Sequence, residues 1–270
     1  MLFFLPDPVG IPCSMALLSC DVPCAAHCVC CPGLRCTPDR TPVACLSGHF
    51  CVSGRASVVH LSEPLLCICL GSAVFGLCIE LNETVVHGFP SGYELREGDI
   101  VGVDTVVELD GYNGDMCYTF PVGEVAPEVM ALMRTTKESL YKGIAAAQEG
   151  KRIGDIANAV QTYCERHGYT VVREMCGHGI GKKMHEDPEV PNYGRRGCGP
   201  VLKKGMCICI EPMINLGSRN IVIERDGWQC RTKDRKPSAH YEHTIAIQPE
   251  GPEILTTFDY IEEALGDRFI

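Results

Sequence analysis

Hydrophobic and polar positions are interleaved over residues 99–121, DIVGVDTVVELDGYNGDMCYTFP, with β-branched and aromatic residues on both sides of Asp110-Gly111. The alternation predicts two β-strands, and Asp110-Gly111 predicts the tight turn between them, because both turn positions require positive φ. With that turn, Asp115 faces Val106, and Asp104 lies two residues along the same strand. Both carboxylates then project from one face and favour a cation between them. A turn at Asn113-Gly114 would separate them, and two solvated aspartates on an exposed face are the simpler alternative.

Helical spacing follows the hairpin. Residues 127–149 place Val129, Met130, Met133, Leu140, Ile144 and Ala147 on one stripe. A second helix is predicted over 154–166, where His167 ends the helix rather than binding a ligand. Strands are expected at 170–175, 206–211, 220–224, 228–233 and 240–248, with a glycine-rich turn at 177–181, a polar loop through Tyr193 and a short helical tail. Two helices among antiparallel strands predict an α+β fold.

The length and net charge of the chain limit the kinds of fold and partner that it can have. The 270 residues can bury a substantial core, and the net charge of −10 argues against nucleic acid or an anionic membrane as the main partner. No apolar run approaches the ~20 residues that span a bilayer. The start, MLFFLPDPVG, has no basic residue and is interrupted by two prolines, so we do not interpret it as a signal peptide. We expect a cytoplasmic protein.

Cysteine is distributed unevenly, with twelve of the 19 in residues 1–80. Residues 1–77 show neither helical nor strand periodicity, and we predict a Cys-rich leader that is disordered or non-native, arising from a wrong start site or a frame shift. The domain proper would then span 78–270. A zinc module and a disulfide scaffold are the alternatives for the leader, the zinc module using Cys24, His27, Cys28, Cys30, Cys31 and Cys36. The later cysteines, such as Cys207 and Cys209, are typical of reduced core residues.

Three further residues stand where packing alone does not explain them. His178 lies in GHGIG (177–181), which lacks the spacing and the following helix of a nucleotide loop. Glu211 ends the apolar strand MCICI, and Glu242 interrupts the apolar alternation of HYEHTIAI. Together with Asp104 and Asp115 they form an oxygen-rich set that suits Mn, Fe(II), Co or Zn. Four negative charges match two divalent cations.

These motifs resemble a known family. D-x10-D, CGHGIG, IEPM and YEHT, together with LNETVVHG, DGW at 226–228, TKDRKPSAHYEHT and PEILT, are similar in order and spacing to the type I methionine aminopeptidases of the bacterial kind. The resemblance covers residues ~78–265. It implies the pita-bread (creatinase/aminopeptidase) fold and metal-dependent removal of the initiator methionine from nascent proteins, by a metal-bridging water that attacks the first peptide bond.

The resemblance also implies a role for each site residue. Asp104 would chelate one metal, Asp115 and Glu242 would bridge both, and His178 and Glu211 would complete the second. Glu211 would also act as general base and then acid. His87 would lie near the scissile amide and His185 would hydrogen-bond the substrate carbonyl. Trp228 and Cys78 would line the methionine pocket. The simpler alternatives are a turn residue for His87, a loop residue for His185 and a core residue for Trp228.

Two departures from the family pattern stand out. Relatives supply two helices and aromatic pocket residues before LNETVVHG, and residues 1–77 do not show them, so we expect a fold that is incomplete or aberrant in its N-terminal half. Met184 stands where many relatives have phenylalanine, a change that roughly keeps volume.

The alternative functions are a prolidase or aminopeptidase P type of peptidase, and a catalytically inactive, truncated pita-bread protein that acts as a binding module. The expected partners are nascent polypeptides with N-terminal methionine, with ribosome association, no membrane and no direct nucleic-acid binding. The expected state is a monomer.

Overall fold

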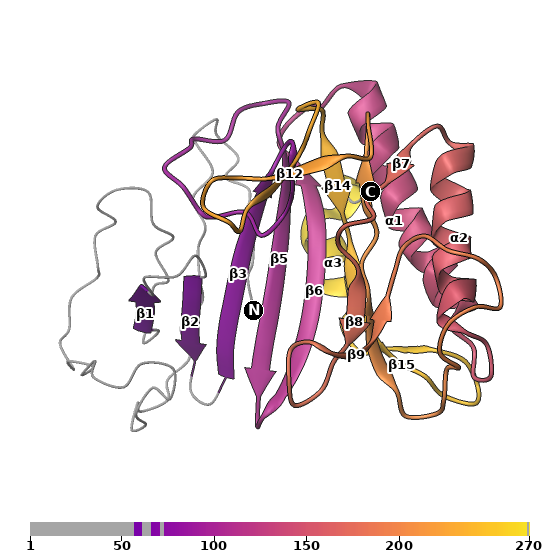
Figure 1. The fold of residues 1–270 in the computed structure, drawn as a ribbon. Coiled ribbons are helices and arrows are strands. Elements are labelled where there is room, and N and C mark those ends of the chain that lie inside the picture. The colour runs from indigo at the N-terminus through magenta and orange to yellow at the C-terminus, as the bar shows by residue number, and fades with distance from the viewer. Residues whose placement is uncertain (1–56, 61–65, 71–72, 269) are drawn as a thin grey trace.

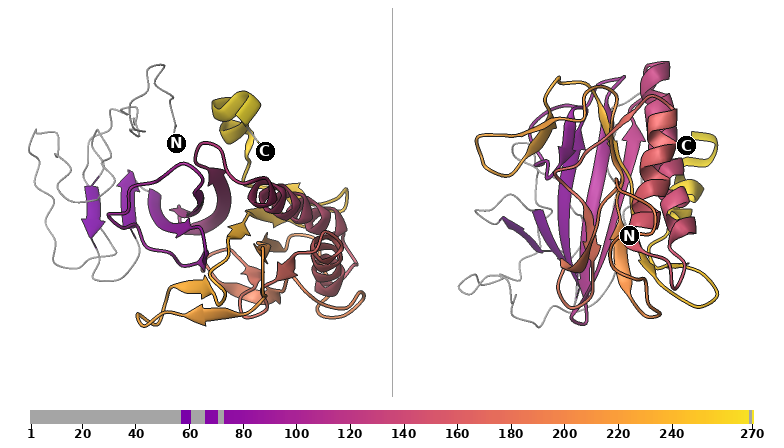
Figure 2. Two further views of the ribbon diagram at one scale, coloured as in Figure 1. Left: turned by 90° about the horizontal axis from the view of Figure 1, so that it is seen from above. Right: turned by 45° about the vertical axis from the view of Figure 1, so that its right-hand side comes forward.

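The computed structural model describes residues 57–60, 66–70, 73–268 and 270. One large antiparallel sheet dominates, and two long helices cover one side of it (Figure 1). Viewed from above, the strands on the N-terminal side of the sheet curl (Figure 2). The α+β arrangement predicted from the pattern of hydrophobic positions is confirmed.

The main sheet is built from hairpins and long returns, all antiparallel. Its strands lie in the order β1 (Ser57–His60), β2 (Leu66–Leu70), β3 (Ala73–Leu81), β5 (Ile100–Leu109), β6 (Tyr112–Pro121), β15 (Glu242–Ala246), β10 (Cys207–Ile210), β8 (Gly177–Gly179) and β9 (Glu186–Val190), with β16 (Glu253–Ile254) paired to β15. Strands distant in sequence therefore meet at the middle of the sheet.

The other regular elements of the described residues are two small sheets and three α-helices. One sheet joins β14 (Ser238–His240), β11 (Met213–Asn215) and β7 (Thr170–Val171). The other joins β12 (Ile221–Ile223), β13 (Cys230–Thr232) and β4 (Thr84–Val86). The helices are α1 (Pro127–Ala146), α2 (Ile153–Arg166) and α3 (Asp259–Leu265), with a short 3₁₀ helix at Gly266–Arg268. None of the helices in this part of the chain is long and apolar enough to cross a bilayer.

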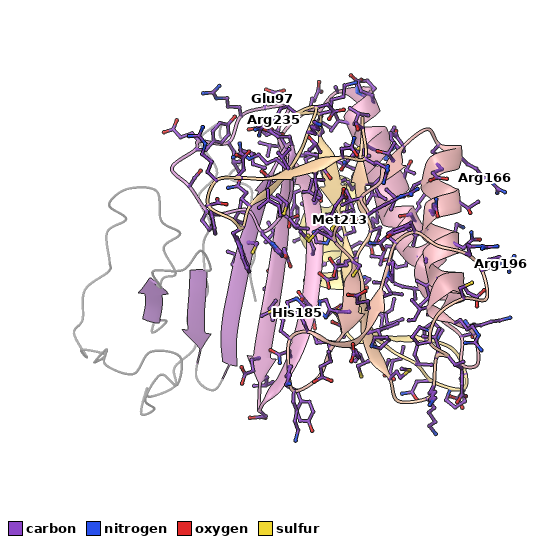
Figure 3. The ribbon with its side chains drawn as sticks, in the orientation of Figure 1. Glu97, Arg166, His185, Arg196, Met213 and Arg235 are labelled. Carbon is purple, nitrogen blue, oxygen red and sulfur yellow. The ribbon has the colours of Figure 1, made fainter. Side chains whose placement is uncertain are left out.

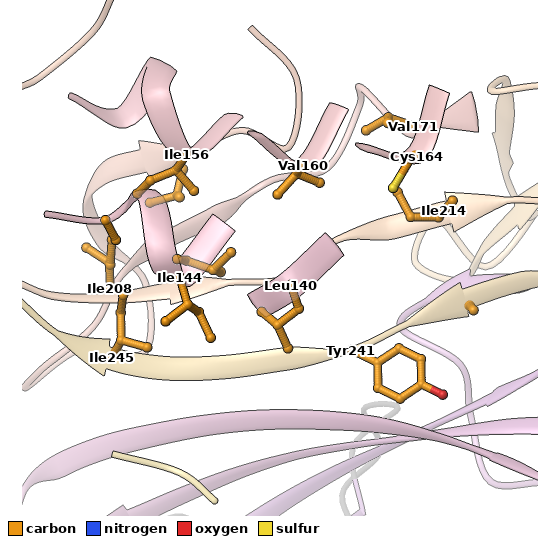
Figure 4. Close-up of a cluster of buried hydrophobic side chains, with 14 of the residues drawn as sticks. Leu140, Ile144, Ile156, Val160, Cys164, Val171, Ile208, Ile214, Tyr241 and Ile245 are labelled. Atoms are coloured by element: carbon orange, nitrogen blue, oxygen red, sulfur yellow. The ribbon is translucent and has the colours of Figure 1, made fainter. Parts of the chain in front are cut away.

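The core lies between the two long helices and the sheet. Leu140 and Ile144 of α1, Val160 of α2 and Ile208 of β10 belong to one buried hydrophobic cluster (Figure 4). Gly143 lets the helices approach closely, because a Cβ there would come to 2.9 Å from Val160 Cγ2. Burying each such aliphatic side chain contributes about 1.5–3 kcal/mol. His167 ends α2, as predicted, and its Nδ1 lies 2.8 Å from the Tyr163 carbonyl oxygen.

The hairpin register is the one predicted. Val106 of β5 pairs with Asp115 of β6, and Asp110 and Gly111 form the turn with φ of 52° and 78°. Positive φ at both positions is what a two-residue hairpin turn requires. Asp104 and Asp115 therefore lie on one face, as expected.

The turn predicted at 177–181 is wrong in one respect, because Gly177–Gly179 forms strand β8. Neither Gly177 nor Gly179 has positive φ. Each is instead pressed against backbone: a Cβ would come to 2.3 Å from the carbonyl oxygen of Cys209 or of Asp187, respectively. The expected polar loop contains the edge strand β9. Its sequence EDPEV is mostly polar and exposed, although Val190 is buried, so the pattern of hydrophobic positions does not predict it. The pattern of hydrophobic positions does not predict strand β11 either.

The predicted leader falls largely outside the described residues, including the alternative zinc ligands between Cys24 and Cys36. Within the described part, β3 begins at Ala73 and pairs with β5 along its length, to Leu81 opposite Val101. The described sheet thus begins upstream of residue 78, the domain start expected from the sequence.

Candidate metal centre

Four adjacent strands bring chemistry-bearing side chains to one place. Asp115 lies in β6, Glu242 begins β15, Glu211 directly follows β10, and His178 is the middle residue of β8. These strands are consecutive in the sheet, and the backbone register sets Glu242 opposite Cys117 and Ile210 opposite His243. Ligand atoms of Asp115, His178 and Glu242 lie within 4.8 Å of one another, with Cys209 Sγ among them. We call Asp115, His178, Glu211 and Glu242 the central cluster.

His178 is oriented for ligation. Its Nδ1 lies 2.9 Å from the Gly179 carbonyl oxygen, which can only accept, so Nδ1 carries the proton. The other nitrogen, Nε2, lies 3.8 Å from Asp115 Oδ2 and 3.7 Å from Glu211 Oε1. Burial lowers the pKa of His178, which favours the neutral ring. A neutral imidazole with Nε2 free and Nδ1–H held by a carbonyl is the form that binds metals.

The carboxylates of the cluster repel one another. Burial, followed by the charge of Glu211, raises the pKa of Asp115 to about 7, and burial raises that of Glu211 to about 8. Burial and then Asp115 raise the pKa of Glu242 well above its usual range. Burying several carboxylates together is costly unless cations or protons neutralise them.

Orphaned oxygen atoms support the fit to a metal. Asp115 Oδ1 and Glu242 Oε1 are buried and have no hydrogen-bond partner. Buried polar atoms are normally satisfied, so two unpartnered carboxylate oxygens beside a free imidazole nitrogen are explained by a cation. Cys209 contributes a neutral thiol, because burial and the charge of Glu242 raise its pKa well above the usual range. The donor set therefore fits hard or borderline divalent ions.

Asp104 lies beside the cluster. It is half-buried and stands opposite Cys78 in the sheet register. Burial and the charge of Asp115 raise its pKa well above the usual range, and a hydrogen bond joins it to Asp115. The structure thus brings all five predicted metal ligands together, on the neighbouring strands β5, β6, β15 and β8 and directly after β10.

Sequence reasoning missed the residues that hold these ligands. Thr244 Oγ1 accepts from the Asp115 N–H and donates to the Asp115 carbonyl, both at 2.9 Å. Asn192 Nδ2 donates to the Glu211 carbonyl at 2.8 Å. Glu80 and His240 form a buried pair next to Glu211. Each partner is far away in sequence, so no local spacing could have revealed it.

His185 borders an open cleft. Its ring lies 4.4 Å from that of His178, edge to face, and the residue is exposed. Figure 3 shows His185 in front of the central strands, on the loop between β8 and β9. A cleft of ≈ 630 Å³ is lined by both histidines and by Cys176. A substrate entering here would reach His185 before the buried carboxylates.

His87 and Trp228, expected on the substrate side, contact each other. Their rings stack at 4.5 Å with an interplanar angle of 23°, and Trp228 is 38% exposed. His87 adopts φ of 60°, which places it at a sharp bend after β4. Burial lowers its pKa, and the charges of Glu80, His240 and His185 act on it, so it faces the same site. Cys78 is buried in β3.

Comparisons with known proteins show which family the chain is similar to. Residues 71–249 match metallopeptidase family M24. The chain is 53% identical over 180 residues to "Methionine aminopeptidase" of Clostridium perfringens, covering 67% of this chain and 72% of the relative. The crystal structure of methionine aminopeptidase from Rickettsia prowazekii matches with a TM-score of 0.66 and 43% identity, over 67% of this chain and 73% of that one. The prolidase from Pyrococcus horikoshii, at 24% identity and a TM-score of 0.55 over 67% and 47% of the two chains, shares the pita-bread fold alone.

Proposed function

The chain belongs to metallopeptidase family M24, and on that premise we propose that it removes the N-terminal methionine from newly made proteins by hydrolysing their first peptide bond. The observation that carries this proposal is the central cluster, a buried set of carboxylates and one neutral histidine with unpartnered oxygen atoms. The similarity to relatives named methionine aminopeptidase supports the substrate class.

We assign the metal to the central cluster together with Asp104. Asp104 would chelate one ion, Asp115 and Glu242 would bridge two, and His178 and Glu211 would complete the second. Mn, Fe(II), Co or Zn suits this donor set. When bound, divalent cations polarise the substrate carbonyl and make a water molecule acidic enough to act as nucleophile near neutral pH.

Glu211 is the proposed general base and acid. Burial raises the pKa of Glu211 in the metal-free chain to about 8, so this carboxylate binds a proton more tightly than an exposed glutamate does. It would accept a proton from the nucleophilic water at a carboxylate oxygen and donate it to the departing amine. The exposed His185 would hydrogen-bond the carbonyl oxygen as charge develops there, and His87 would contact the scissile amide.

The stacked His87–Trp228 pair and buried Cys78 are the proposed methionine pocket. Aromatic side chains and a small apolar thiol suit a flexible thioether side chain. We extend the proposal to nascent polypeptides as substrates, met at the ribosome, and to a monomer in the cytoplasm. The reduced cysteines of the described residues suit a reducing compartment.

The experiment compares Met-Ala-Ser with an Xaa-Pro peptide, using the purified full chain with Mn or Co. Release of methionine from Met-Ala-Ser, lost in Glu211→Gln, supports the proposal. Cleavage of the Xaa-Pro peptide instead would favour a prolidase type of activity. Two bound metal ions without turnover of either peptide would favour the inactive binding module.

A further inference from the structure

Glu80 and His240 form an ion pair inside the protein, between β3 and the end of β14. His240 Nδ1 lies 3.0 Å from Glu80 Oε2, and the side chains are only 3% and 2% exposed. A carboxylate accepts hydrogen bonds, so Nδ1 carries a proton. Removing two ionisable groups from water costs several kcal/mol each unless their geometry is well satisfied. A pair placed here therefore needs an explanation beyond packing.

The surrounding strands are fitted to this pair. Gly102, opposite Glu80 in the sheet register, leaves room for its carboxylate, because a Cβ there would come to 2.6 Å from Glu80 Oε2. Cys117 Sγ donates to the same oxygen at 3.8 Å. Thr119 Oγ1 accepts from the His240 N–H and donates to its carbonyl oxygen. Thr119 thus holds the backbone of His240, and Glu80 holds its imidazole.

The free side of the imidazole points at Glu211. His240 Nε2 is buried, has no hydrogen-bond partner and lies 3.7 Å from Glu211 Oε2. The other oxygen of Glu211, Oε1, lies 3.7 Å from His178 Nε2. One face of the Glu211 carboxylate therefore meets the central cluster, while the other meets a histidine that Glu80 holds in place.

We propose that Glu80 and His240 are positioning residues for Glu211: Glu80 fixes the imidazole of His240, and His240 fixes the orientation of the Glu211 carboxylate toward the central cluster. The proposal rests on the proposed function, since it concerns the group assigned as base and acid. Holding that carboxylate in one rotamer removes the need to order it in the transition state. The effect falls on turnover rather than on substrate binding.

The kinetic test uses His240→Leu, His240→Gln and Gly102→Ala, assayed on Met-Ala-Ser at saturating Mn. We expect kcat to fall about 10–100-fold in His240→Leu, as when a partner that orients a metal ligand is lost, with KM within about twofold. His240→Gln, whose amide can still donate toward Glu211, should recover part of kcat. Gly102→Ala keeps the His240 side chain but displaces Glu80, which holds its imidazole. This variant should therefore also lower kcat.

His243→Gln is the matched control. His243 is also buried, lies in β15 next to Glu242, and points away from the cluster, with Nδ1 3.0 Å from Thr256 Oγ1 and its ring 3.9 Å from that of Phe258. It should keep the wild-type kcat. A loss of kcat in His240→Leu no larger than in this control, or a rise in KM alone, would overturn the proposal.

A second measurement works without metal and without activity. Imidazole ¹H–¹⁵N spectra of the metal-free full chain identify the His240 ring by its absence in His240→Gln. Glu211→Gln and Gly102→Ala should each shift that ring's signals, and His243→Gln should not. Unshifted signals in Glu211→Gln would overturn the positioning role even if the wild type cleaves Met-Ala-Ser. An inactive wild type with shifted signals would instead count against the proposed function alone.

The number of metal ions bound per chain distinguishes the positioning role of Glu80 and His240 from a role as metal ligands. Glu80, Cys117 and His240 also place ligand atoms within 4.8 Å of one another. We favour the positioning role because His240 Nδ1 and Glu80 Oε2 are hydrogen-bonded to each other, so neither atom is available to a metal ion. A further metal ion per chain that disappears in Cys117→Ser would overturn this choice.

Discussion

His178 faces Asp115 from a neighbouring part of the sheet, with Nε2 3.8 Å from Oδ2 and the side chains 10% and 7% exposed. Its other nitrogen is committed to the Gly179 carbonyl, so the free nitrogen has no partner except the carboxylates. Such a contact brings little stability to a metal-free chain, because a neutral imidazole does not balance carboxylate charge. A bound cation gives both side chains a favourable partner.

The first prediction concerns the two proposed bridging ligands. Asp115→Asn and Glu242→Gln should each abolish measurable turnover of Met-Ala-Ser and lower the bound metal per chain. Each replaces a buried carboxylate, one oxygen of which has no hydrogen-bond partner, by a neutral amide. Metal analysis and kcat on the purified variants measure this. Asp110→Asn is the control, since it lies at the exposed hairpin tip with φ of 52°, which asparagine tolerates. Near-normal activity in either ligand variant would refute the bridging role.

The second prediction is a pH dependence of the metal-free chain. Asp115 and Glu211 keep protons in the folded state up to pKa values of about 7 and about 8, whereas the unfolded chain releases them near ordinary carboxyl values. His240 adds the same sign: burial lowers its pKa, but Glu80 and other carboxylates raise it to about 9. The folded state therefore holds more protons than the unfolded state, and stability falls as pH rises.

The usable window lies between about pH 6.5 and about pH 8, since below it the histidines with lowered pKa values, His87, His178 and His243, act in the opposite direction. Thermal unfolding in a chelator should show Tm falling across this window. Saturating Mn should weaken or reverse the trend, because metals bind the ionised carboxylates. A Tm that rises with pH in the chelator would contradict the argument.

The third prediction concerns the glycine after His178. Gly179→Ala should lower both metal content and stability, because the new Cβ would come to 2.3 Å from the Asp187 carbonyl oxygen and push β8 and β9 apart. Gly205→Ser is a control for changing a glycine outside the site, at an open turn where no atom lies within 4 Å of the added Cβ, although its φ of 83° adds some strain. Wild-type metal binding in Gly179→Ala would show that the close approach is dispensable.

Local pattern predicted the hairpin well, because period-two alternation and Asp110-Gly111 fix which residues face each other. Local pattern did not predict the features that depend on contacts between residues distant in sequence. Strand β9 is mostly polar because it lies at the sheet edge, and β8 is itself the glycine-rich sequence Gly177–Gly179, which also resembles a turn. The pairing of Glu80 with His240 joins positions 160 residues apart. The roles of the five proposed ligands came from motif resemblance, and they stay predictions until metal binding is measured.

The last prediction separates transition-state stabilisation from metal binding. His185→Ala should lower kcat by about 10²–10³-fold, as when a donor to a developing oxyanion is removed. Its bound metal should stay at the wild-type level, because His185 is exposed and meets the cluster only through the edge-to-face contact with His178. His167→Ala, at the exposed end of α2, is the matched histidine control and should keep full activity. If His185→Ala loses metal in proportion to kcat, the residue supports the metal centre instead. If it keeps kcat, the substrate carbonyl is bound elsewhere along the cleft.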